Sequence, residues 1–177
     1  RSPGLKVTYW ELDGNATNLG AGDGVILNAS YGDADGVVDG RVSGKELESW
    51  RADGQTGWVQ FEFPETATLT HVVLHDLVDP GLNAPGGVIE TSADGETWGN
   101  AVEFGPLSPD GAGDVIAYPH SGRYVRVSIT EAEGSYAGFA EIKLLSADPT
   151  GSLISGNTAV IASSEAPGYA PAKAIDG

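Results

Sequence analysis

Short apolar runs separated by glycine-containing turns fill the middle of the chain and restrict its fold more than any other feature. In Trp58–Phe63, Phe61 and Phe63 fall on one side of an extended chain, while Gln60 and Glu62 fall on the other. No stretch keeps a 3.6-residue apolar period over three helical turns. The pattern therefore predicts an all-β fold, an antiparallel β-sandwich with about eight main strands. The expected strands are Gly24–Ala29, Gly57–Phe63, Thr68–Asp76, Gly87–Ser92, Val102–Phe104, Asp114–Tyr118, Tyr124–Thr130 and Ala140–Ser146.

A short motif occurs at both ends of the chain. Val25–Ser30 leads through a turn to Val37-Val38-Asp39-Gly40, and Val160–Ser164 leads to Ala174-Ile175-Asp176-Gly177. Because the two Asp-Gly pairs lie 137 positions apart, about one domain length, we predict a tandem array of β modules. The expected organisation is a lead-in over 1–17, a complete sandwich over 18–147, a linker over 148–156 and the first strand of a second repeat over 157–177.

The net charge limits the classes of partner. The chain of 177 residues has 25 acidic and 9 basic residues, a formal net charge of −16. Such a field repels nucleic acid and anionic lipid, so we predict no nucleic-acid partner, and the charge disfavours a membrane partner. Solubility is the simplest role of this charge, and a preference for neutral or cationic ligands is the functional alternative. There is no cysteine, so disulfides and thiol chemistry are excluded.

Six motifs, of which the first belongs to the repeated motif above, follow one another in a fixed order. They combine tryptophan-containing strands, an Asp-Gly hairpin and two late strands. The motifs are Ala29-Ser30 with Val38-Asp39-Gly40, Glu48-Ser49-Trp50, Trp58–Phe63, Thr91–Trp98, Arg123–Val127 and Phe139–Ile142.

In this order the motifs resemble the discoidin, or coagulation factor 5/8 type C, domain. The resemblance implies a galactose-binding-like jelly roll, the fold shared with family 32 carbohydrate-binding modules. This chain departs from the pattern in three places. It has no cysteine pair joining the module's ends, it has Glu48 where threonine is usual, and its His75–Asn83 segment matches no ligand-binding motif.

The resemblance also implies a structural Ca²⁺ ion near the first Asp-Gly turn. Carried over to this chain, its ligands are Asp39, Glu48, Glu141 and the main-chain carbonyl of Ala140. Carboxylates and loop carbonyls are the hard oxygen ligands that Ca²⁺ prefers. The alternative is that Asp39 only forms an Asx turn before Gly40 and that Glu141 faces solvent.

A ligand surface is expected on the loops at one end of the sandwich. Sugars are bound by an aromatic platform with polar side chains at the hydroxyls. An alternative for Trp50 is a place in the core, and Trp58 and Trp98 are expected in the core. The predicted ligand-binding residues are Trp50, Arg51, His75, Asp76, Asn83 and Tyr136.

These observations predict a non-catalytic carbohydrate-binding module of a secreted or cell-surface protein, which tethers its neighbours to polysaccharide. No nucleophile elbow, paired histidines or phosphate-binding loop is present in the sequence. The alternative is an adhesive or assembly module, in which the strand Thr158–Ser164 pairs with a sheet edge of its own module or of a neighbouring subunit. Phospholipid binding is a third reading, disfavoured by the acidic charge.

Overall fold

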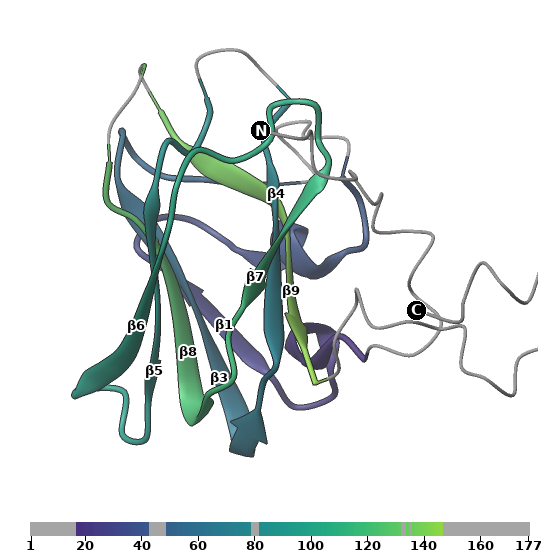
Figure 1. Cartoon of the computed structure of the whole chain (residues 1–177), viewed down its shortest axis with the longest axis vertical. Coiled ribbons are helices and arrows are strands. Elements are labelled where there is room, and N and C mark those ends of the chain that lie inside the picture. The colour runs from purple at the N-terminus through teal and green to yellow at the C-terminus, as the bar shows by residue number, and fades with distance from the viewer. Residues whose placement is uncertain (1–16, 43–48, 79–81, 132–133, 135, 147–177) are drawn as a thin grey trace, which may run out of the picture.

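The structure is a computed structural model, and it describes residues 17–42, 49–78, 82–131, 134 and 136–146. Within these residues the chain forms two antiparallel sheets packed face to face, and two short 3-10 helices, η2 (Leu19–Ala21) and η3 (Asp35–Val38) (Figure 1). The predicted β-sandwich is confirmed. The strands are β1 (Ile26–Ala29), β2 (Trp50–Arg51), β3 (Gly57–Thr68), β4 (His71–Asp76), β5 (Gly87–Ser92), β6 (Trp98–Phe104), β7 (Gly113–Ala117), β8 (Ser121–Ile129) and β9 (Gly138–Leu145).

The larger sheet has the strand order β1-β3-β8-β5-β6, and the smaller has the order β2-β9-β4-β7. Alternation along β3 and β8 sets the register, with Val59 opposite Val127 and Phe61 opposite Val125. These four side chains are fully buried and face the smaller sheet. At roughly 25 cal/mol per Å² of apolar area, each such side chain stabilises the sandwich by about 2 kcal/mol.

Gly87 shows how closely the larger sheet is packed. A Cβ atom at this position would overlap the Ser128 carbonyl oxygen and lie 2.5 Å from the Phe104 ring. Only glycine lets β5 begin here, between β6 and β8.

The sequence and the structure differ at several strand boundaries. β2 was not predicted, because two residues are too short to show alternation. β6 begins at Trp98 instead of Val102, and β3 continues through Pro64 to Thr68 with an irregular register between Glu62 and Ala67. The predicted second repeat, its strand Thr158–Ser164, most of the lead-in and the 148–156 linker lie outside the described residues.

Candidate functional site

The topology gathers most of the long loops at one end of the sandwich, the upper end in Figure 1. β4 and β8 end there, and β5 and β9 begin there, because Gly87 is opposite Ile129 and Asp76 is opposite Phe139. We call this end, which carries the β1–β2, β2–β3, β4–β5, β6–β7 and β8–β9 connections, the loop end. Binding residues in such folds are placed on loops held by a rigid scaffold.

Trp50 holds the first of these loops to the core. Its side chain is only 1% exposed and stacks on Phe139 at 6.0 Å between ring centroids. Its indole Nε1 donates a hydrogen bond of 2.8 Å to the Tyr31 carbonyl oxygen. The structure therefore places Trp50 in the core, and burial leaves no ring face for the sugar contact that was predicted as one of its two roles.

Arg51 and Tyr136 form an exposed pair at the loop end. The Arg51 guanidinium carbon lies 4.9 Å from the centre of the Tyr136 ring, and Tyr136 is 40% exposed. The backbone next to the pair is fixed by two hydrogen bonds. Ala52 N–H donates to the Ala137 carbonyl, and Ala137 N–H donates to the Gly54 carbonyl. The structure thus brings together two of the predicted ligand-binding residues on one surface.

Tyr31 is a further exposed aromatic residue at the loop end and was not among the predicted residues. Its ring is 56% exposed, and its carbonyl is the acceptor for Trp50. The sequence signal was weak, since Tyr31 precedes Gly32 in what reads as an ordinary turn. Trp50 thus anchors the Tyr31 backbone to the core, while Arg51, the next residue of β2, carries the exposed pair with Tyr136.

His75 and Asp76 are buried inside the loop end instead of lying on its surface. His75 Nδ1 is 3.0 Å from the Gly111 carbonyl oxygen, and burial lowers the pKa of this histidine. Asp76 Oδ1 accepts hydrogen bonds from the N–H groups of Leu77, at 2.9 Å, and Ala84, at 3.0 Å. These placements disagree with the predicted direct contacts to ligand, and the two side chains act instead as internal supports of the β4–β5 and β6–β7 connections.

The Asp76 carboxylate has an unusual environment. Asp76 is fully buried, and its Oδ2 atom has no hydrogen-bond partner in the described part of the chain. Burial raises its pKa to about 6, and the nearby negative charge of Asp114 adds to that rise. Asn83, the other predicted ligand residue on this connection, is half-buried beside Ala84.

Asp39 and Glu141 come together below the loop end, where η3 packs on β9. Glu141 is 1% exposed, and its Oε2 atom accepts a 3.2 Å hydrogen bond from Gly40 N–H. Burial raises the Glu141 pKa to about 7, and the charge of Asp39 contributes to the same direction. The predicted meeting of these two carboxylates is therefore present in the structure.

The side chains at this corner supply only some of the oxygen ligands that a Ca²⁺ ion needs. Ala140 lies beside Glu141 with its side chain buried, and Glu48 lies outside the described residues. No group of three or more metal-ligating side chains occurs in the described ranges. Because Ca²⁺ takes six to eight oxygens, Asp39 and Glu141 would need main-chain carbonyls, such as that of Ala140, and water to complete the site.

A second aromatic cluster occupies the outer face of the larger sheet. The Arg126 guanidinium carbon lies 4.7 Å from the Trp58 ring centre and 3.9 Å from that of Trp98. Arg126 also donates to Gln60 Oε1 at 2.7 Å. The two tryptophans were expected in the core, and the structure places them half-buried on this outer face, where they enclose a cation.

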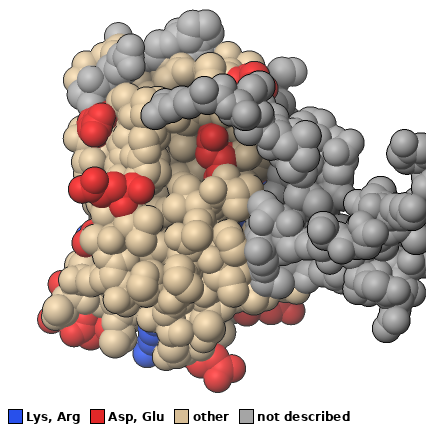
Figure 2. Space-filling view, viewed as in Figure 1, with Lys and Arg blue, Asp and Glu red and all other residues tan. Residues whose placement is uncertain are grey.

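Acidic side chains outweigh basic ones on the visible face of the molecule (Figure 2), most of which is neither acidic nor basic. On the face in Figure 2 they gather along one side and at the lower rim, while basic side chains form only a small patch. This distribution agrees with the net charge of −16. In the described residues, no helix is both long and apolar enough to cross a membrane.

The sequence matches the model of the F5/8 type C domain over residues 24–142, which is more than half of the chain. The chain therefore belongs to the F5/8 type C domain family, as the motif order predicted. No curated protein sequence matches it.

Solved structures with this fold include sugar-binding domains and a part of an enzyme. The lectin binding domain of Lectinolysin, a mutant complexed with Lewis b, matches with a TM-score of 0.62 and 17% identity, over 75% of this chain and 99% of that one. A family 32 carbohydrate-binding module from Clostridium perfringens, in complex with GalNAc-β-1,3-galactose, matches with a TM-score of 0.56 and 14% identity, over 73% and 98%. A putative alpha-L-fucosidase from Bacteroides thetaiotaomicron matches with a TM-score of 0.58 and 15% identity, over 73% of this chain but 28% of that one. These likenesses show a fold that carbohydrate-binding modules also have.

Proposed function

We propose that this chain is a non-catalytic carbohydrate-binding module of a secreted or cell-surface protein, and that it tethers attached modules to polysaccharide. The observation that carries the proposal is the exposed Arg51–Tyr136 pair at the loop end, held by the backbone hydrogen bonds of Ala52 and Ala137. The Tyr136 ring offers an apolar face for a sugar ring, and the guanidinium of Arg51 offers donors for its hydroxyl oxygens. Membership of the F5/8 type C family and the glycan complexes of proteins with this fold support the same class of ligand.

Affinity electrophoresis in gels containing galactose- or uronate-rich polysaccharides tests the proposal. We expect retarded migration that is lost in Tyr136→Ala and weakened at least about fivefold in Arg51→Ala, as for an aromatic hot spot. Arg123→Ala is the matched control, because Arg123 lies at the opposite end of β8 and pairs with Glu62 at 3.0 Å. Unchanged retardation in Tyr136→Ala, or no retardation by any polysaccharide, would refute the proposed site.

We further propose that Asp39 and Glu141 hold a structural Ca²⁺ ion together with the Ala140 carbonyl and Glu48. The support is that Glu141 is buried close to the negative charge of Asp39. A bound cation would offset the burial that raises the Glu141 pKa. When bound, the ion would fix the η3 turn to β9. At a Ca²⁺ concentration of about 100 times Kd, the free energy of unfolding should rise by about 2.7 kcal/mol.

The Ca²⁺ proposal is checked by thermal unfolding with Ca²⁺ and with EDTA. Glu141→Gln should remove the Ca²⁺-dependent rise in Tm, and the exposed Glu103→Gln should keep it. A chain whose Tm is the same in Ca²⁺ and EDTA has no such ion.

Self-association through Thr158–Ser164 is a separate proposal about the same protein. A strand can add only at a sheet edge, and β1, β6 and β7 are edges longer than the two-residue β2. Size-exclusion chromatography before and after deletion of 156–177 tests it, because an unchanged elution volume excludes a donated strand.

A further inference from the structure

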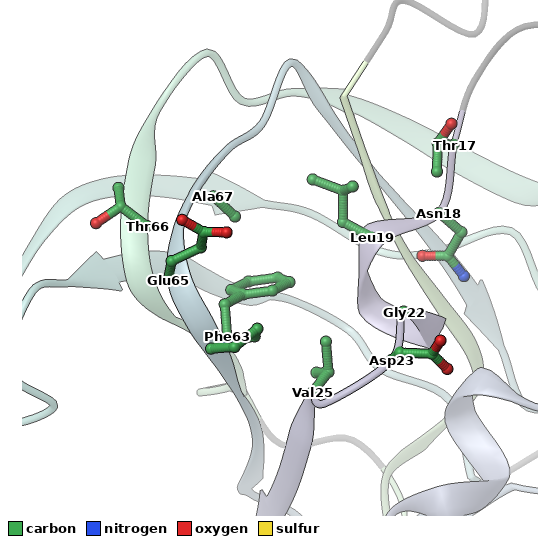
Figure 3. A pocket seen from close by; sticks show the side chains of 11 residues that line it. Thr17, Asn18, Leu19, Gly22, Asp23, Val25, Phe63, Glu65, Thr66 and Ala67 are labelled. Carbon is green, nitrogen blue, oxygen red and sulfur yellow. The ribbon is translucent and has the colours of Figure 1, made fainter.

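A pocket opens at the end of the sandwich opposite the loop end. It lies between η2 with the following turn and the distal part of β3 (Figure 3). Its volume is about 260 Å³, just below the range of pockets for drug-sized ligands. At about 30 Å³ per water-sized group, it has room for about nine heavy atoms. It therefore suits one side chain or a very small molecule. Its lining comprises Thr17, Asn18, Leu19, Gly22, Asp23, Val25, Phe63, Pro64, Glu65, Thr66 and Ala67.

The pocket exists because β3 leaves its register there. Between Glu62 and Ala67 the pairing of β3 with β8 is irregular, and Pro64 in this stretch has no N–H to donate to a neighbouring strand. Facing it, Asn18 fixes the η2 segment, since its Oδ1 accepts from Gly20 N–H at 3.1 Å and from Leu144 N–H at 3.0 Å. The η2 wall is thus held to β9 by hydrogen bonds, and the irregular stretch of β3 forms the other wall.

The chemistry of the lining is divided between an apolar floor and an acidic rim. Figure 3 shows the side chains of Leu19, Val25 and Phe63 gathered in the middle, with the Asp23 and Glu65 carboxylates on opposite sides of them. Both acidic residues are exposed. All eleven lining residues are described, and none of them is basic. The rim therefore offers acceptors and negative charge, while the floor offers apolar contact.

We propose that this pocket binds an alkylammonium group, such as the side chain of a lysine. The methylene chain would contact Leu19, Val25 and Phe63, and the ammonium would lie at the acidic rim that Asp23 and Glu65 form. Lysine side chains combine these two parts, an apolar stem and a compact charged head with three donors. The net charge of −16 attracts such a cation to the molecule, and the floor distinguishes it from an inorganic ion.

Titration of the ¹⁵N-labelled chain by NMR tests the site with three probes of similar length. They are pentylammonium, the neutral 1-pentanol and Nα-acetyl-lysine N-methylamide. We expect the amide signals of Leu19, Gly22 and Ala67 to shift, with pentylammonium bound at least about threefold more tightly than 1-pentanol. Raising the salt from about 20 mM to about 200 mM should weaken pentylammonium binding and leave 1-pentanol unaffected.

Charge-neutral variants separate the cation site from a merely apolar hollow. Asp23→Asn with Glu65→Gln should bring the affinities of pentylammonium and 1-pentanol to within a factor of about 1.5, because both carboxylate partners are gone. The control is Asp35→Asn with Glu103→Gln, which removes the same charge from exposed positions outside the pocket and should keep the difference.

Each outcome of the titration decides the proposal. Binding of the lysine derivative together with pentylammonium supports a protein-borne lysine as the source of the group, and binding of pentylammonium alone supports a free amine. Equal binding of 1-pentanol, an unchanged preference in the Asp23→Asn/Glu65→Gln protein, or no shifts at these amides would overturn the proposal. The carbohydrate proposal would be untouched by that failure, because Tyr136 lies at the other end of the molecule.

Discussion

Neutralising Asp76 should change how the stability of the protein depends on pH. Its pKa is raised from 3.8 to about 6, mainly by burial. Because the folded state holds this proton more tightly than the unfolded chain does, stability falls as pH rises from about 4 to about 6. At 1.36 kcal/mol per pKa unit, the charged form costs the folded state about 3 kcal/mol above that window.

The Asp76→Asn variant keeps an oxygen acceptor for Leu77 N–H and Ala84 N–H but cannot ionise. The free energy of unfolding, measured with urea in EDTA, should therefore change in favour of the variant by about 3 kcal/mol between pH 3.5 and pH 7.5. The variant can also lose stability by the same amount at every pH, for example because an amide hydrogen lacks an acceptor. Such a loss does not change how the difference in free energy of unfolding depends on pH. Other groups titrate in both proteins and cancel in the difference.

Asp94 provides the opposite control. Its pKa is lowered to about 2 by hydrogen bonds from the N–H groups of Thr97 and Glu96 and from the Ser92 hydroxyl. It contributes stability above about pH 4 that is lost as pH falls, so Asp94→Asn should differ from the native protein with the reverse slope. A stability difference between Asp76→Asn and the native protein that stays constant from pH 3.5 to pH 7.5 would refute the reasoning about burial.

Three further substitutions test the packing by urea unfolding. Asn18→Ala should cost about 2 kcal/mol, because it leaves two backbone N–H groups without their acceptor, whereas the exposed Asn28→Ala should cost nearly nothing; equal effects would contradict the role of Asn18. Arg126→Lys should cost about 1 kcal/mol through loss of the planar contact with both indoles, and a stability equal to that of the native protein would argue against that contact. Gly87→Ala should cost more than about 2 kcal/mol, since its Cβ meets the Ser128 carbonyl, and a neutral result would mean that the strands are not so close.

The two-sheet fold could be predicted because apolar and polar residues alternate clearly along the long strands. In β3 the inward Val59, Phe61 and Phe63 alternate with Trp58, Gln60 and Glu62. The same parity places Trp58 on the outer face, where the structure has it, and not in the core where it was expected. A two-residue strand such as β2 leaves no such signal.

The candidate site was harder to predict because it depends on local irregularities. His75 and Asp76 are the last residues of the predicted strand Thr68–Asp76, so their side chains were expected to reach the loops. In the structure β4 ends at Asp76 as predicted, but both side chains are buried, and the register shifts between them. By contrast, the Asp39–Glu141 contact followed from the family motif order, because the distance of 101 residues between Gly40 and Glu141 gives no local pattern.

The first and last residues of the sandwich lie side by side: Asn18 bridges to Leu145, and Ser146 N–H donates to the Thr17 carbonyl oxygen. A mechanical load pulling on positions 17 and 146 would consequently break these few contacts in sequence, starting from the two ends of the chain segment. Little shear force would act on the two sheets until the contacts between residues 17–18 and 145–146 had broken. Under tension the domain would therefore yield first where its two ends meet, and the Arg51–Tyr136 pair at the loop end would keep its arrangement.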